Sequence, residues 1–239
     1  IGTFIHYILE TLLRQAIPAE GDFDVPSDEE LIARTEKIVS EYISRIYPKE
    51  LGESKKLEHL YKRLRTLALL MVKNIVKEFS HSKFRPAFFE LRANGKDGNP
   101  SPMYFDINGS TKVSFSGIID RVDIFKQNGD VYIRVVDYKT GTKEFSIDDI
   151  DKGINTQMLL YLFTLCRAQN TDFRNALGVA EEGNLLPAGA VYLSANIPVI
   201  EAEDYEDRDA IMNKAEKELE RSGVILGDEE ILYAMSEEI

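Results

Sequence analysis

The residues best suited to chemistry in this sequence are two aspartates and a lysine, set in two β-rich runs that flank a polar turn. Asp120 lies in the run 117–123, and Asp137 and Lys139 lie in the run 131–141. Residues two apart on a strand project to the same face, so Asp137 and Lys139 should point the same way. Such charges are costly in a half-buried sheet unless they are paired, and a hard divalent cation bound by carboxylate oxygens would pair them.

A hairpin would make Asp120 and Asp137 neighbours on adjacent strands, although they are 17 positions apart. This set suits metal-assisted phosphodiester cleavage, in which carboxylates bind Mg²⁺ and the metal lowers the pKa of a bound water. Lys139 would orient that water or offset charge developing on the phosphate. The alternative is a surface hairpin with scattered acids and a lysine that reaches solvent. Asp123 competes with Asp120, but residues three apart fall on opposite faces unless a bulge intervenes, so we expect one of them to serve the site.

The segment after the hairpin, 157–163, is apolar almost all round and predicts a buried helix. Gln157 and Tyr161 are four apart and therefore share one face of it. A buried amide and a buried phenol on one stripe must meet polar groups. Those groups could be the metal site, a DNA phosphate, or simply other core residues that satisfy them.

The elements that must position these residues follow from apolar spacing and from cap and turn residues. We expect helices over 4–13, 27–46, 55–79, 154–166 and 205–221, strands over 87–92, 103–107 and 188–194, and the hairpin over 112–138. Ser27 should cap the second helix, with Glu30 in the capping-box position. This order predicts an α/β or α+β sandwich. We expect one domain over 1–239, with a helical elaboration at 1–80 and the core with an acidic C-terminal segment at 81–239.

The composition limits the setting and the partners. A hydrophobic content of 44% over 239 residues allows a sizeable core. The single cysteine, Cys166, excludes a disulfide framework and any all-cysteine metal site within these residues, and it fits a reducing, cytoplasmic setting. No apolar run approaches the roughly 20 residues of a membrane span, and no signal peptide is visible. Because the first residue is Ile1 rather than Met, we expect a fragment of a longer protein.

The net charge of −12 argues against strong unaided binding to nucleic acid. The charge is uneven, because the segment 55–77 has seven basic residues against one acid, and 200–239 has fourteen acids against four basic residues. Two solvated helix faces explain this pattern most simply. The alternative is that the basic helix faces DNA.

Taken together, the segments 117–121 and 137–139 and the pair Gln157-x-x-x-Tyr161 resemble the motifs of the RecB-type branch of the PD-(D/E)xK nucleases. That branch also has a Gly-x-x-x-His element on an upstream helix, which this chain matches with Gly2 and His6. The segments 222–228 and 234–235 resemble the region after the nuclease core in the AddB-type chain of AddAB helicase–nucleases. The resemblance implies a restriction-endonuclease-like core with a central mixed β-sheet flanked by helices.

The resemblance also implies ligands for one or two Mg²⁺ or Mn²⁺ ions. His6, Asp120 and Asp137 would be metal ligands, with the carbonyl of Tyr138 as a further one. Glu90 has two interpretations, an upstream acid of the family or an exposed strand residue. The remaining histidines, at positions 59 and 81, match no motif and are expected on the surface.

Three further residues acquire roles by the same resemblance. Lys139 would be the catalytic lysine, and Gln157 and Tyr161 would position it or the DNA. The implied function is a metal-dependent DNA exonuclease domain, the nuclease module of a helicase–nuclease in double-strand-break repair and recombination. Its substrate would be a single strand fed by a motor subunit, whose tethering supplies the local concentration that charge does not.

Relatives of the AddB type carry an iron–sulfur cluster held by cysteines that bracket this domain. Those cysteines are not present here, since Cys166 falls within the expected helix 154–166. Either the sequence stops inside them or the protein lacks the cluster. Two other functions share these motifs or this fold, a stand-alone or CRISPR-associated exonuclease and a catalytically silent DNA-binding or assembly module. The match at 222–235 disfavours the first, and the intact Asp120, Asp137 and Lys139 disfavour the second.

Overall fold

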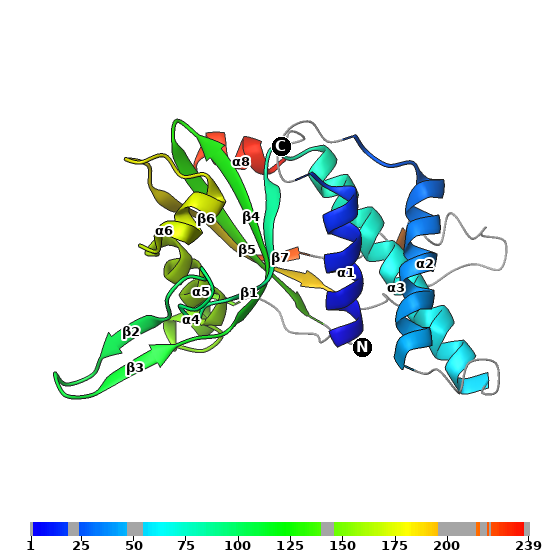
Figure 1. Ribbon diagram of the computed structural model, residues 1–239, viewed down its shortest axis with the longest axis horizontal. Helices are drawn as coiled ribbons and strands as arrows, with labels where there is room; N and C mark the ends of the chain where they lie inside the picture. Colours follow the sequence, from blue (N-terminus) through cyan, green and yellow to red (C-terminus); the bar gives the residue numbers. More distant parts are fainter. Residues whose placement is uncertain are drawn as a thin grey trace. The chain divides into compact units, whose positions relative to one another are not determined.

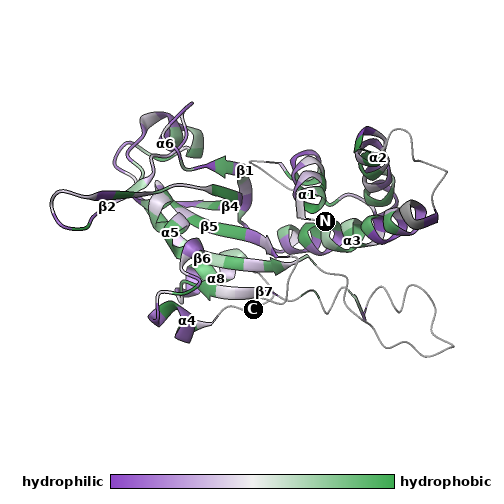
Figure 2. Ribbon diagram, turned by 90° about the horizontal axis from the view of Figure 1, so that it is seen from below, coloured by the Kyte–Doolittle hydropathy of each residue, from purple (hydrophilic) through white to green (hydrophobic). Residues whose placement is uncertain are grey.

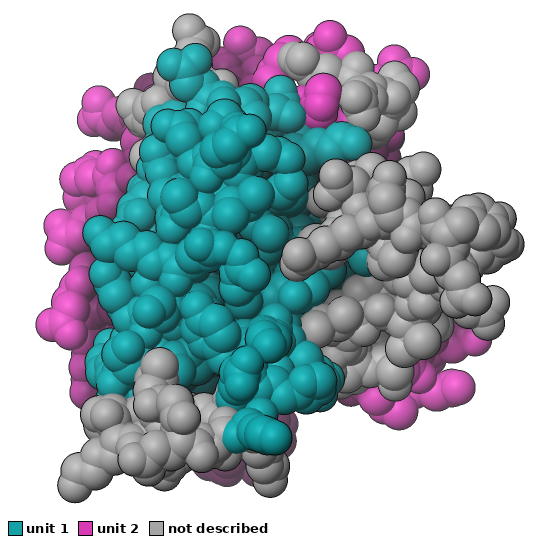
Figure 3. All heavy atoms as spheres, turned by 90° about the vertical axis from the view of Figure 1, so that its right-hand side faces the viewer, with its two compact units in different colours: residues 1–80, 138–143, 193–221 teal, residues 81–137, 144–192, 222–239 magenta. Residues whose placement is uncertain are grey.

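The computed structural model describes residues 2–18, 24–46, 55–139, 146–195, 214–215, 219 and 221–236 (Figure 1). The chain divides into two compact units (Figure 3). Unit 1 contains Ile1–Ser80, Tyr138–Lys143 and Leu193–Arg221, and unit 2 contains His81–Asp137, Glu144–Tyr192 and Ser222–Ile239. Within the described ranges, no helix has the length and apolar character needed to cross a membrane.

Unit 1 is built on three helices, α1 (Gly2–Ala16), α2 (Asp28–Ile46) and α3 (Lys55–Ser80), which pack on one another. The expected first helix is confirmed, and its apolar positions are buried: Phe4, Ile5, Ile8, Leu9, Leu12 and Leu13. The capping box of α2 is confirmed as well. The Ser27 N–H donates to Glu30 Oε2 over 3.1 Å, and the Glu30 N–H donates to Ser27 Oγ over 3.3 Å.

A five-stranded sheet supplies most of unit 2. Its strands lie in the order β1 (Arg85–Arg92), β4 (Ile118–Gln127), β5 (Asp130–Lys139), β6 (Leu185–Ser194) and β7 (Arg221–Ile225). The pairs β1–β4 and β4–β5 are antiparallel. β6 runs parallel to β5, because Val131 N–H donates to the Asn184 carbonyl at one end and Ala195 N–H donates to the Lys139 carbonyl at the other. The predicted mixed sheet flanked by helices is therefore confirmed.

The hairpin β4–β5 turns at Asn128 and Gly129, whose φ angles of +53° and +89° suit a two-residue turn that matches strand twist. The prediction that the hairpin begins at residue 112 was wrong. β3 (Lys112–Phe115) pairs instead with β2 (Met103–Asp106) in a separate two-stranded ribbon. The chain leaves that ribbon through Ser116 and Gly117 before it enters the sheet.

Among the described residues, four short helices accompany the sheet: α4 (Ile147–Asp151), α5 (Gln157–Cys166), α6 (Thr171–Leu177) and α8 (Glu229–Met235). α5 starts three residues later than predicted, because Gly153 and Asn155 take left-handed φ angles of +73° and +59°. It is also less buried than predicted, since Phe163 is 45% exposed. Its other face carries Leu162 and Leu165, which belong to a core that also contains Val122 of β4, Ile133 and Val135 of β5, Ala190 of β6 and Phe173 of α6.

The sequence did not predict α4, α6, β7 and α8 as separate elements. The charged helix expected over 205–221 falls almost wholly outside the described residues, and its expected last residue, Arg221, begins β7.

Candidate active site

Asp120 and Asp137 lie at the same end of the central hairpin. Arg121 of β4 pairs with Val136 of β5, so the next residues outward on the two strands are Asp120 and Asp137. Directly opposed residues on antiparallel strands have Cβ atoms about 4.5–5.5 Å apart. Both carboxylates are half-buried. The turn at 128–129 thus sets a register that brings the two acids together.

Glu90 is the third acid at this end of the sheet. The register of β1 with β4 pairs Leu91 with Ile119, which places Glu90 opposite Asp120. A carboxylate oxygen of Glu90 and one of Asp120 lie within 4.8 Å of each other. Glu90 has a left-handed φ of +51° in the middle of a strand, a conformation that costs a non-glycine residue about 1–2 kcal/mol. Strain of this kind and close like charges are both common at functional sites.

Asp123 belongs to the opposite face of β4 and is fully buried. Arg121 and Arg134, which are 1% and 5% exposed, converge on it from β4 and β5. Arg121 Nε lies 2.9 Å from Asp123 Oδ1, and Arg134 Nη2 donates to Asp123 Oδ2 over 2.8 Å. Asp123 therefore holds two buried guanidinium groups, which leaves Asp120 as the carboxylate of β4 that can serve a metal.

Asp137 and Lys139 occupy alternate positions near the end of β5, and both are half-buried. One carboxylate oxygen of Asp137 is shielded from solvent. Burial, followed by the charge of Asp137, holds the pKa of the Tyr192 phenol on β6 above its ordinary value. The strand thus presents a carboxylate and an ammonium group two residues apart on one face.

His6 lies on α1 within unit 1, where it packs against the residue that follows Asp137. Its ring is 5.7 Å from the ring of Tyr138, with an interplanar angle of 68°. The Tyr138 side chain is 5% exposed, so the backbone beside it is well fixed. In unit 1, the predicted histidine and the predicted carbonyl ligand therefore come from two neighbouring residues.

Gln157 and Tyr161 are one helical turn apart on α5, and the Gln157 amide donates to Tyr161 Oη over 2.8 Å. Tyr161 is 4% exposed and packs on Phe115, with ring centroids 5.3 Å apart. Its hydroxyl also lies against Gly117, where a Cβ atom would come within 2.2 Å. Gln157 is exposed, so the expectation of a buried amide is wrong, whereas the expected buried phenol is confirmed. The amide and the phenol are joined by one hydrogen bond, and Tyr161 holds the backbone that leads into β4.

The basic helix α3 is less available to DNA than its composition indicates. Lys62 pairs with Glu58 over 2.8 Å, Lys73 pairs with Asp28 over 2.5 Å, and Arg65 contacts Glu36. The Lys62 hydrogen bond also lowers the pKa of Glu58. Lys62, Arg65 and Lys73 thus have acidic partners in the part of this segment that the structure describes.

The donor set suits a hard divalent cation. Glu90, Asp120 and Asp137 supply carboxylate oxygens, which are the ligands that Mg²⁺ and Mn²⁺ prefer. They come from the neighbouring strands β1, β4 and β5, so the sheet itself fixes their spacing. A cation among them would also offset the repulsion between Glu90 and Asp120. The site therefore has the ligands that metal-assisted hydrolysis of a phosphodiester requires.

Comparison with known proteins gives an independent result. The family model of the PD-(D/E)XK nuclease superfamily matches residues 1–232. A subunit of an ATP-dependent helicase/deoxyribonuclease from Clostridium acetobutylicum is 27% identical over 240 residues, and proteins of the same name from Acetivibrio thermocellus and Clostridioides difficile are 26% and 27% identical. Each match covers the whole of this chain and 20% of the relative, so the chain spans about a fifth of the length of these curated relatives.

Proposed function

The chain belongs to the PD-(D/E)XK nuclease superfamily, and we propose that it is a metal-dependent deoxyribonuclease domain that acts as an exonuclease. The observation that supports this most directly is that Glu90, Asp120 and Asp137 lie on three neighbouring strands, with Glu90 opposite Asp120 and Asp120 opposite Asp137. Lys139 follows on the same face of β5. This is the residue set that metal-assisted phosphodiester hydrolysis needs.

In this proposal Asp120 and Asp137 bind the metal, together with His6 and the carbonyl of Tyr138. One or two Mg²⁺ or Mn²⁺ ions, when bound, would polarise the scissile phosphate and lower the pKa of a bound water. The Lys139 ammonium donates to the attacking water or to a phosphate oxygen and stabilises the negative charge that develops there.

In the same proposal, Gln157 and Tyr161 are positioning residues that do not react themselves. Their hydrogen bond and the contact of Tyr161 with Gly117 hold the start of β4, which carries Asp120. Catalysis of this kind depends on groups held in place before substrate arrives, because a shift of about 1 Å costs orders of magnitude in rate.

We further propose that the domain is the nuclease module of a helicase–nuclease, as the names of its relatives indicate. Its substrate would be single-stranded DNA delivered by a motor subunit during double-strand-break repair and recombination in the cytoplasm. Delivery by a tethered motor explains how a chain with a net charge of −12 can act on DNA. An iron–sulfur cluster, if present, would belong to the full-length protein.

The test is degradation of end-labelled single-stranded DNA in Mg²⁺, in Mn²⁺ and in EDTA. We expect metal-dependent loss of the label in the wild-type protein and none with Asp120→Asn or Asp137→Ala. Asp151→Asn, which removes an exposed carboxylate from α4, is the matched control and should retain activity. A thermal shift with Mn²⁺ should accompany activity, because a ligand that binds the folded state stabilises it. Absence of both cleavage and stabilisation by metal would point to a catalytically silent module.

A further inference from the structure

The ribbon β2–β3 has a surface that the fold does not explain. It projects from the sheet of unit 2 in both views and is not part of the five-stranded sheet (Figures 1 and 2). Large apolar side chains are exposed along it, with Tyr104 and Ile107 each at 63%, Val113 at 48% and Phe105 at 39%. A two-stranded ribbon is only marginally stable by itself, and exposed apolar clusters usually mark a binding surface.

A pocket of about 390 Å³ lies at the base of this ribbon. It is lined by Ser101, Pro102, Met103, Tyr104, Thr164, Arg167, Ala168, Gln169 and Asn170. Cavities of a few hundred Å³ are large enough for a small ligand or a single nucleotide unit. The ribbon thus contributes one exposed aromatic ring to a recess whose other wall follows α5.

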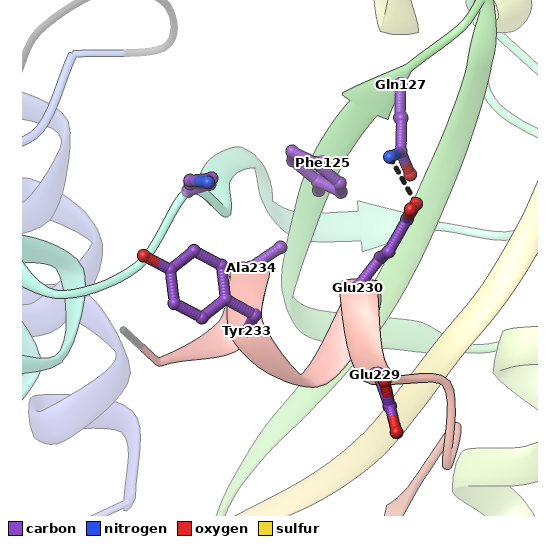
Figure 4. A pocket seen from close by; sticks show the side chains of 7 residues that line it. Phe125, Gln127, Glu229, Glu230, Tyr233 and Ala234 are labelled. Carbon is purple, nitrogen blue, oxygen red and sulfur yellow. Dashed lines mark hydrogen bonds between the residues drawn. The ribbon is translucent and has the colours of Figure 1, made fainter. Parts of the chain in front are cut away.

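The charge of this pocket differs from that of the chain. The chain has 41 acidic residues, yet none lines the pocket, which contains the guanidinium group of Arg167. A second recess, between Phe125 and α8, contrasts with it because its lining includes the carboxylates of Glu229 and Glu230 (Figure 4) as well as Lys83. A phosphate would be attracted to the first recess and repelled by the carboxylates of the second.

The polar groups in the pocket are suited to a nucleotide. The Arg167 side chain is exposed, so its guanidinium group is accessible to a phosphate. Asn170 accepts a hydrogen bond from the Phe173 N–H through its Oδ1 atom, which leaves its NH₂ group available as a donor. An aromatic face with a nearby arginine and amide donors is the usual combination for binding single-stranded nucleic acid.

The pocket is also close along the chain to the candidate active site. Met103 at its edge pairs with Phe115, whose ring contacts Tyr161. Phe115 and Asp120 are five positions apart along the chain, which limits the distance between them to about 18 Å. At about 3.4 Å per stacked nucleotide, that span corresponds to roughly five nucleotides.

We propose that this pocket binds one nucleotide of single-stranded DNA a few nucleotides away from the bond that is cleaved. Its base stacks on Tyr104, and a phosphate of the same segment contacts Arg167. This inference rests on the proposed function and adds a substrate subsite to it. Stacking is independent of sequence, because every base has a π face. The subsite also gives an acidic chain a local, favourable contact with DNA.

The test measures binding apart from cleavage. Fluorescence anisotropy in EDTA would follow a labelled oligothymidylate and an abasic oligonucleotide of the same length. Tyr104→Ala should weaken oligothymidylate binding at least about fivefold and leave abasic binding unchanged, whereas Tyr104→Phe should bind like the wild type. Arg167→Gln should weaken both and should reduce the slope of log affinity against log salt by about 0.7.

Two control variants make the result specific. Tyr233→Ala removes a tyrosine that is 50% exposed in the second recess, and Lys37→Gln removes an exposed cation from α2. Both should bind like the wild type. Unchanged binding of both oligonucleotides by Tyr104→Ala and Arg167→Gln would overturn the subsite, even if metal-dependent cleavage persists. If Tyr104→Ala weakens oligothymidylate binding but the wild-type protein cleaves no DNA in any metal, the subsite would be supported and the proposed nuclease activity would be wrong.

Discussion

Replacing Gly117 with alanine should destabilise unit 2 through Tyr161. A Cβ atom at position 117 would lie 2.2 Å from Tyr161 Oη and 2.9 Å from two ring carbons, so the ring must move. Tyr161 is 4% exposed, and its displacement would break the 2.8 Å hydrogen bond from Gln157. Overpacking costs about 1–3 kcal/mol and the lost hydrogen bond about 1 kcal/mol. The expected loss in free energy of unfolding is therefore about 2–4 kcal/mol. Each kcal/mol should lower Tm by about 2–4 °C.

The assay is urea and thermal unfolding followed by circular dichroism, with a double-mutant cycle. Tyr161→Ala removes the atoms that Gly117→Ala would meet, so the second substitution should cost little in that background. Gly227→Ala is the matched control, because no atom lies within 4 Å of its added Cβ and its φ is not left-handed. Unfolding of Gly117→Ala at the wild-type midpoint, or an equal cost of the substitution with and without the Tyr161 ring, would refute this role of Tyr161.

Three other predictions follow from the site and its surroundings. Asp123→Asn should lower the free energy of unfolding by about 3–5 kcal/mol, because it removes the negative charge that two buried guanidinium groups share. Asp120→Asn should abolish cleavage without lowering Tm, because it removes a like charge near Glu90; equal melting of the two variants would contradict this. Glu90→Gln should raise the free energy of unfolding in EDTA by about 1 kcal/mol, because it removes a like charge within 4.8 Å of Asp120, and should reduce the thermal shift with Mn²⁺; a lower Tm in EDTA would refute it. Burial raises the pKa of the Cys166 thiol from 9.0 to about 12, so iodoacetamide should react slowly at pH 8 until the protein unfolds. The folded state keeps the thiol proton to a higher pH than the unfolded state. The stability that Cys166 contributes through this proton is therefore complete below pH 9.0 and is lost as the pH rises toward about 12. Free energies of unfolding from urea denaturation at several pH values would check this.

The central hairpin and the first helices could be predicted because their signals are local. Asn128 and Gly129 specify the turn, and a two-residue turn fixes which residues face each other across it. That register alone pairs Asp123 with Arg134, a step that would have identified Asp123 as structural from the sequence. Ser27 and Glu30 likewise indicate the start of α2.

The features that escaped prediction depend on non-local contacts. The ribbon β2–β3 has the composition of ordinary strands, and only its failure to join the sheet distinguishes it. The left-handed conformation of Glu90 has no sequence signal, because glutamate is not a residue that favours positive φ. The apolar run of α5 predicted burial on all sides, whereas tertiary packing covers only one face and leaves Phe163 exposed.

The buried cluster of Asp123, Arg121 and Arg134 favours a single register between β4 and β5. A slip of one residue between β4 and β5 would turn every side chain of the slipped strand to the other face. Asp123 would then lose Arg134, and Asp120 would no longer be next to Asp137. We expect a variant in which the three residues become apolar to stay folded but to show more than one set of strand resonances by NMR; a single set would oppose this. An ion cluster that never contacts substrate would then determine the fidelity of strand alignment at the active site.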